Sequence, residues 1–102
     1  MNRETILKTA TQYVTKDRAS DHGDMEDNFR LIGEYWSLHL GCEVTACDVG
    51  AMMSLLKIAR MKGNQAHMDN YVDGAGYLAC AGEIANRVVL DSQREDAINE
   101  LE

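Results

Sequence analysis

The chain has 102 residues, 45% of them hydrophobic, and its 17 acidic and 10 basic side chains give a formal net charge of −7. This length corresponds to one domain, the apolar content is too high for a disordered chain, and the acidic balance argues against an extended nucleic-acid-binding face. No apolar run approaches the ~20 residues of a membrane-spanning helix and no signal-peptide pattern is present, so we expect a cytoplasmic protein.

Proline is absent and β-branched runs are scarce, a composition that favours helices. Apolar residues at helical spacing predict a first helix over residues 3–15. The polar, aperiodic residues 16–23 that follow are predicted to form a loop. A second helix is expected over residues 25–40, because Asp24 is a suitable N-cap and Gly41 a suitable residue to end a helix.

A third helix is predicted over residues 46–62, where Thr45 and Asp48 have the spacing of a capping box. A fourth helix is expected over residues 66–89. It contains three glycines, each costing about 1 kcal/mol relative to alanine, which suggests that another helix approaches it closely. A second capping box, beginning at Ser92, predicts a separate short last helix.

These helices predict an all-α fold with an antiparallel four-helix core. The bundle is expected to occupy residues 1–90 as one domain, and residues 91–102 to form a short C-terminal helix or tail. Small helical domains with glycine-rich faces often pair, so we expect a homo-oligomer, either a dimer or a tetramer.

Two carboxylates on the fourth predicted helix are the sharpest candidates for chemistry. Asp69 and Asp73 are four residues apart, so both project from one face, where like charges repel. A hard cation such as Mg²⁺ or a facing basic side chain would remove that repulsion. The third helix supplies Lys57 and Arg60 as antiparallel neighbours. The four charges form either a structural ion-pair network or a site where arginine grips phosphate and the aspartates hold Mg²⁺.

The predicted loop before the second helix carries Arg18 and His22, with Asn28 following in the helix. A loop with such side chains suits ligand contact, and the alternative interpretation is a solvated charged face. Further along the second helix, Tyr35 is the candidate for stacking on a base, whereas Trp36 is expected in the core.

The chain carries several short motifs in a fixed order: Asp17-Arg18, His22-Gly23-Asp24, Leu56-Lys57-Ile58-Ala59-Arg60 and Val72-Asp73-x-Ala75-Gly76-Tyr77. Their order and spacing resemble a family of short phage and prophage proteins over about residues 4–86. The Lys-x-x-Arg and Val-Asp-x-x-Gly-Tyr motifs are the most specific part of this resemblance.

More distantly, the layout is similar to the all-α nucleoside triphosphate pyrophosphohydrolases of the MazG and dimeric dUTPase type, helical bundles in which carboxylates bind Mg²⁺ and a water attacks the nucleotide. Those enzymes pair Glu-x-x-Glu with Glu-x-x-Asp, where this chain has Asp-x-x-x-Asp at residues 69–73. The similarity implies a MazG-like fold, Mg²⁺ as cofactor and a nucleotide ligand. The catalytic residues that it implies are Lys57, Arg60, Asp69 and Asp73. The implied metal ligands are Asp69, Asp73, Glu34 and Asp48. The residues implied in nucleotide binding are Arg18, His22, Asn28, Tyr35 and Tyr77.

Three functions stay open at this point. The first is Mg²⁺-dependent hydrolysis of a (deoxy)nucleoside triphosphate, in which Lys57 and Arg60 stabilise the charge that develops on phosphate. The second is a non-catalytic protein that sequesters a nucleotide or a host defence signal. The third is a structural or interaction protein whose charge cluster only fixes the register of two helices.

Overall fold

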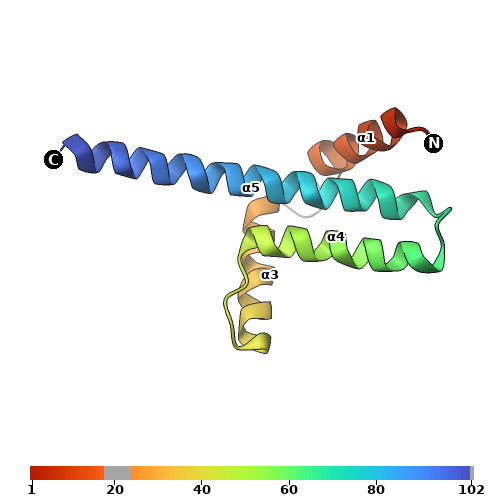
Figure 1. Ribbon diagram of the computed structural model, residues 1–102, viewed down its shortest axis with the longest axis horizontal. Coiled ribbons are helices and arrows are strands. Elements are labelled where there is room, and N and C mark those ends of the chain that lie inside the picture. Colours follow the sequence, from red (N-terminus) through yellow and green to blue (C-terminus); the bar gives the residue numbers. More distant parts are fainter. Residues whose placement is uncertain (18–23, 102) are drawn as a thin grey trace.

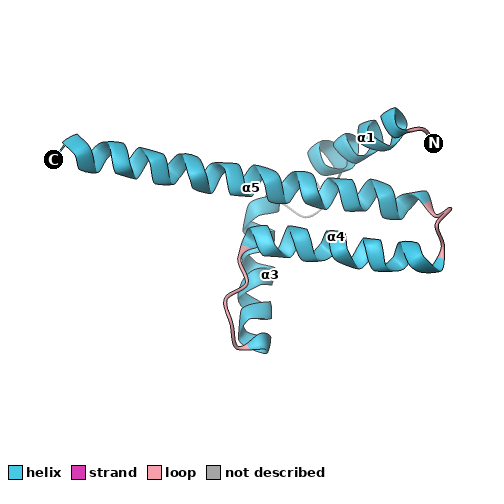
Figure 2. Cartoon of the chain, viewed as in Figure 1, coloured by secondary structure: helices cyan, strands magenta, loops and turns pink. Residues whose placement is uncertain are grey.

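The computed structural model describes residues 1–17 and 24–101, and within these ranges the chain forms four α-helices and no strand (Figures 1 and 2). A single π-helical turn, η1, continues the first helix. The all-α prediction is confirmed. The elements are α1 (Arg3–Gln12), η1 (Tyr13–Asp17), α3 (Met25–Leu40), α4 (Ala46–Gly63) and α5 (Met68–Leu101).

Local capping sets the ends of α3 and α4 where the sequence predicts them. The Asp24 carboxylate accepts a hydrogen bond from the backbone N–H of Asp27 at 3.1 Å, and Gly41 ends α3 in the left-handed conformation with φ 72°. At α4, the Thr45 hydroxyl accepts from the N–H of Asp48 while the Asp48 carboxylate accepts from the N–H of Thr45, which completes the capping box.

The first helical segment runs further than predicted. Helix α1 and the π-helical turn together continue to Asp17, so residues 16 and 17 are helical and not part of a loop. The remainder of the predicted loop, residues 18–23, lies outside the described residues.

Helices α4 and α5 lie side by side and run in opposite directions (Figure 1). Their backbones approach closely at Gly50, where an added Cβ would lie 2.8 Å from the Cβ of Ala81. The Ser54 hydroxyl donates to the carbonyl of Gly74 at 2.8 Å and ties the pair further along. Helix α1 packs on α5, and α3 lies across the pair near the start of α4 (Figure 1). The predicted alignment of four antiparallel helices therefore does not describe this arrangement.

The predicted helix break before Ser92 is wrong, since α5 continues through Leu101. No glycine or proline interrupts residues 84–101, and an unbroken helix keeps the backbone hydrogen bonds that a new N-terminus would lose. All residues from 86 to 101 are exposed, and this part of α5 projects beyond the other helices (Figure 1). The radius of gyration, 16.1 Å, exceeds the ~13 Å of a compact 100-residue domain for that reason.

The apolar core is small for a chain of this length. Its buried members are Ala10, Val49, Val72, Cys80, Ala81 and Ile84. Many larger apolar side chains are exposed, Leu38 to 86% and Leu55 to 62% of their surface. None of the helices within residues 1–17 and 24–101 combines the length and apolar content that crossing a membrane requires.

Candidate functional site

A polar cleft of about 380 Å³ lies where α4 and α5 are connected. It gathers all four charges that the sequence singles out, two from each helix, because the short connection places the end of α4 beside the start of α5. We call it the polar cleft. Its lining residues are Lys57, Arg60, Asn64, His67, Asp69, Asn70 and Asp73.

The charges in the polar cleft are not equivalent. The ammonium of Lys57 lies 3.0 Å from the carboxylate of Asp73, and both side chains are nearly buried, at 14% and 13% exposed. His67 lies 3.7 Å from the carboxylate of Asp69 on the exposed rim. Arg60 is exposed and makes no ion pair with any described residue. Its guanidinium is therefore the cation in the cleft with donors left for a ligand.

Asn70 adds a neutral group to the polar cleft. The residue is only 5% exposed, and its side-chain amide makes no hydrogen bond within the described part of the chain. Among the described residues no side-chain nitrogen or oxygen is both buried and unpaired, so the amide of Asn70 keeps contact with solvent. Because Asn70 lines the cleft, its amide is placed to contact a ligand bound there.

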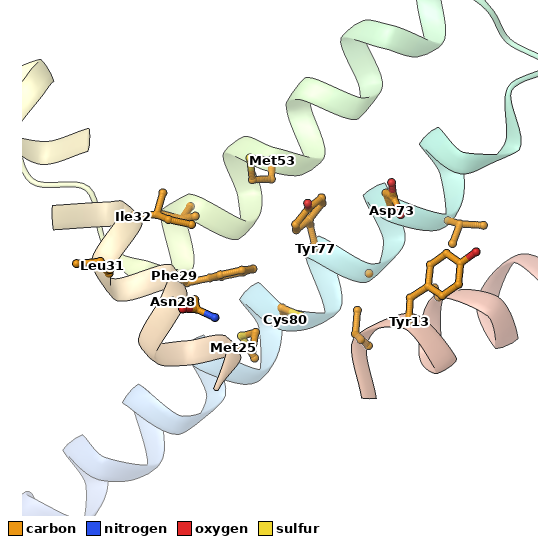
Figure 3. A pocket seen from close by; sticks show the side chains of 15 residues that line it. Tyr13, Met25, Asn28, Phe29, Leu31, Ile32, Met53, Asp73, Tyr77 and Cys80 are labelled. Atoms are coloured by element: carbon orange, nitrogen blue, oxygen red, sulfur yellow. The ribbon is translucent and has the colours of Figure 1, made fainter. Parts of the chain in front are cut away.

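Next to the cleft lies a second hollow, the apolar pocket, also of about 380 Å³ (Figure 3). The rings of Phe29 from α3 and Tyr77 from α5 lie in it with centroids 6.3 Å apart, and Tyr13 enters from η1. Its lining residues are Ala10, Tyr13, Val14, Met25, Asn28, Phe29, Leu31, Ile32, Val49, Met53, Val72, Asp73, Gly76, Tyr77 and Cys80. A mostly apolar cavity with a few polar groups is typical of small-molecule sites.

The polar cleft and the apolar pocket adjoin along the α4–α5 pair. Asp73 lines both. On α4, Met53 of the pocket precedes Lys57 of the cleft by one turn, and on α5 Tyr77 of the pocket follows Asp73 by one turn. The two hollows therefore share one lining side chain and follow one another along the same two helices.

The structure separates other residues that the sequence groups with this site. Tyr35 is 69% exposed on α3 and lines neither hollow, so it is not placed to stack there. Glu34 lines a different groove, between α3 and the C-terminal half of α5. Asp48 belongs to the capping box at the far end of α4 from the cleft. Arg18 and His22 lie outside the described residues.

The described residues do not assemble a metal site by themselves. Within residues 1–17 and 24–101, no three His, Cys, Asp or Glu side chains are grouped so that they could hold a metal ion. Asp69 and Asp73 share the cleft, but Asp73 is paired with Lys57, and the other two predicted ligands lie elsewhere. The role of Mg²⁺ stays a prediction.

Sequence reasoning misses several residues of the two hollows. Asn64 and His67 belong to the short connection between α4 and α5, and that position beside Arg60 is the signal that could have found them. The helical spacing of Phe29 places it on the apolar face of its helix. Spacing alone cannot distinguish a core residue from one that lines a pocket. No pattern in the sequence marks Tyr13 or Asn70.

Comparisons with known proteins place the chain among phage proteins. A family model described as a domain of unknown function (DUF6378) matches residues 5–85. The Gene 55 protein of Mycobacterium phage D29 is 35% identical over 92 residues, which cover 90% of this chain and 61% of that protein. The Gene 55 protein of Mycobacterium phage L5 is 45% identical over 74 residues, covering 72% of this chain and 47% of that protein.

The chain thus spans less than two thirds of the length of these relatives. No solved structure matches it significantly. The family match includes every residue that lines the polar cleft and the apolar pocket. The resemblance to a phage protein family is confirmed, and the chain belongs to the family described as a domain of unknown function, DUF6378.

Proposed function

We propose that this protein binds a nucleotide, with a phosphate group in the polar cleft and the nucleobase in the apolar pocket. The observation that carries the proposal is that the two hollows adjoin at Asp73. A nucleotide has the same division, since a flat ring of low polarity is joined to a charged group at a short distance. We expect this binding to take place in the cytoplasm of the infected host cell.

The polar cleft supplies the donors that a phosphate needs. A guanidinium presents paired N–H groups in the geometry of phosphate oxygens, and that of Arg60 makes no ion pair with a described residue. The side-chain amide of Asn70 can donate to the same group. Lys57 lies deeper in the cleft, where its charge is largely offset by that of Asp73.

The apolar pocket supplies surfaces for a ring. Phe29 on α3 and Tyr77 on α5 have ring centroids 6.3 Å apart, and Tyr13 lines the pocket from η1 (Figure 3). Stacking of a base on such side chains contributes about 1–3 kcal/mol per base. Asn28 and Tyr77, two of the residues predicted to contact the nucleotide, are both in this lining.

Binding without hydrolysis is the form of the proposal that the site supports best. Pyrophosphohydrolases of the MazG type gather carboxylates from two helices around Mg²⁺, whereas the described carboxylates here do not group in threes. The MazG-like fold and the binding of Mg²⁺ by Asp69 and Asp73 stay predictions from the sequence.

Calorimetry of the whole chain tests the proposal. The four common ribonucleotides and the four common deoxyribonucleotides are each titrated into the wild-type protein and into the Arg60→Gln variant. We expect at least one to bind, and Arg60→Gln to weaken it about tenfold or more, because a hydrogen bond to a charged group contributes ~1.5–3 kcal/mol. Lys62→Gln is the matched control, since Lys62 is an exposed cation of the same helix outside the cleft.

Two results would contradict the proposal: no binding of any nucleotide, or equal affinities of wild type and Arg60→Gln. Chromatography of the nucleotide after incubation with Mg²⁺ separates binding from catalysis. We expect the nucleotide to remain intact, and release of pyrophosphate would establish the hydrolase instead.

We also propose that the protein is a homo-oligomer. The support is the amount of apolar surface that the single chain leaves uncovered. On α3, Leu31, Tyr35 and Leu38 follow one another at helical spacing and are 51%, 69% and 86% exposed. Contiguous apolar surface of this kind usually marks a contact with another chain.

A further inference from the structure

Resting on the proposed function, we infer that the nucleotide bound here carries a single phosphate. The charges that line the polar cleft carry this inference. Lys57 and Arg60 are balanced by Asp69 and Asp73, so the formal charge of the cleft is zero when His67 is neutral. Within the described residues, no other lysine or arginine lines the cleft or the apolar pocket.

One of the two cations in the cleft is already paired with a carboxylate. Lys57 is 3.0 Å from Asp73 in a nearly buried pair, so its charge is largely neutralised before any ligand arrives. Arg60 is left as the cation without a carboxylate partner among the described residues. One phosphate monoester brings about −1.5 to −2 charge at neutral pH, which Arg60, the Asn70 amide and the imidazole of His67 can meet.

A second and a third phosphate would find no such partners among the residues that the structure describes. They would add negative charge to a cleft that holds two carboxylates, and Coulomb repulsion grows as water is displaced from a partly buried site. A site for polyphosphates normally surrounds the phosphate groups with several cations or with a metal held by protein carboxylates. The described residues offer one uncommitted guanidinium and no grouped metal ligands.

A titration series with one base isolates this effect. The nucleoside and its 5′-mono-, di- and triphosphates are compared by calorimetry at constant ionic strength, using the base that wild type binds best, with and without Mg²⁺. We expect the monophosphate to bind at least tenfold more tightly than the nucleoside. We expect it also to bind more tightly than the triphosphate in both buffers, with the larger difference in the buffer without Mg²⁺.

The variant Asp69→Asn tests the electrostatic cause. Asp69 is exposed at the rim, so its replacement by the isosteric amide removes one negative charge with little effect on folding. The affinity ratio of monophosphate to triphosphate should fall severalfold. Asp91→Asn, an exposed position on the same helix but outside the cleft, should leave the ratio unchanged.

The outcomes separate this inference from the proposed function. Tighter binding of the triphosphate in either buffer, or a ratio that Asp69→Asn does not move, overturns the single-phosphate inference and leaves nucleotide binding in place. Absence of binding by every member of the series overturns both.

Discussion

At the level of single residues, glycines decide how closely the helices approach. A Cβ on Gly50 would lie 2.8 Å from the Cβ of Ala81 and 3.0 Å from the carbonyl oxygen of Tyr77. At Gly76 it would lie 2.9 Å from Val14, so the expected close approach to the glycines of α5 is found there. Gly82 has nothing within 4 Å, so close packing within the chain does not account for it.

Gly50→Ala and Gly82→Ala form a matched pair for unfolding measurements. Gly50→Ala should lower the free energy of unfolding by about 1–3 kcal/mol, because α4 and α5 must move apart to admit the methyl group. Gly82→Ala should raise it by up to about 1 kcal/mol, since alanine favours the helix and meets open space. Urea titrations followed by circular dichroism give both values.

Equal stability of Gly50→Ala and wild type would contradict the close approach of α4 and α5. A loss of stability in Gly82→Ala would mean that another chain covers that side of α5. If that loss of stability depended on protein concentration, the covering chain would be a second copy of this protein.

At the level of elements, α5 is a helix with two environments. Its first half holds the buried residues Asn70, Val72, Gly76, Cys80, Ala81 and Ile84, packed against α4 and α1. Its second half, from residue 86 to 101, is exposed throughout. A helical segment of that length without packing is only marginally stable in water.

Hydrogen exchange should therefore divide α5 at about residue 86. We expect amides of residues 70–84 to be protected to the level of global unfolding, and amides beyond Asn86 to exchange orders of magnitude faster by local fraying. Mass spectrometry of peptic fragments measures both segments in one experiment. Uniform protection along the whole of α5 would show that the second half packs against another chain.

At the level of the whole molecule, the distribution of apolar surface is the main observation. Within the described residues, the fully buried side chains of appreciable size are Val49 and Val72, whereas leucines on α1, α3, α4 and α5 are exposed. A core this small contributes little hydrophobic stabilisation. Association of copies would cover the remainder and add the missing burial.

Light scattering after size-exclusion chromatography should give a mass that is a multiple of 11.4 kDa at micromolar concentration. Leu38→Asp should lower that mass, because Leu38 is 86% exposed on the apolar face of α3 and a carboxylate there would be costly to bury in an interface. Gln12→Glu, at an exposed polar position on α1, is the control and should leave the mass unchanged. A monomer of 11.4 kDa for wild type would contradict the homo-oligomer.

The sequence by itself determines the helices of this protein and the charged residues of its cleft. Both ends of α3 and the start of α4 follow from Asp24, Gly41 and the Thr45–Asp48 capping box, which act over three or four residues. The grouping of Lys57 and Arg60 with Asp69 and Asp73 follows almost as locally, since a short connection fixes which ends of two helices meet.

Only the tertiary structure decides the rest of the site. It brings Tyr13, Phe29 and Asn70 to the hollows, leaves Tyr35 outside them, and keeps Glu34 and Asp48 away from the other carboxylates. The physical reason is that these relations depend on how α3 and α1 cross α5. Contacts between residues far apart in the chain set those crossings, and no periodicity or capping pattern within one helix specifies them.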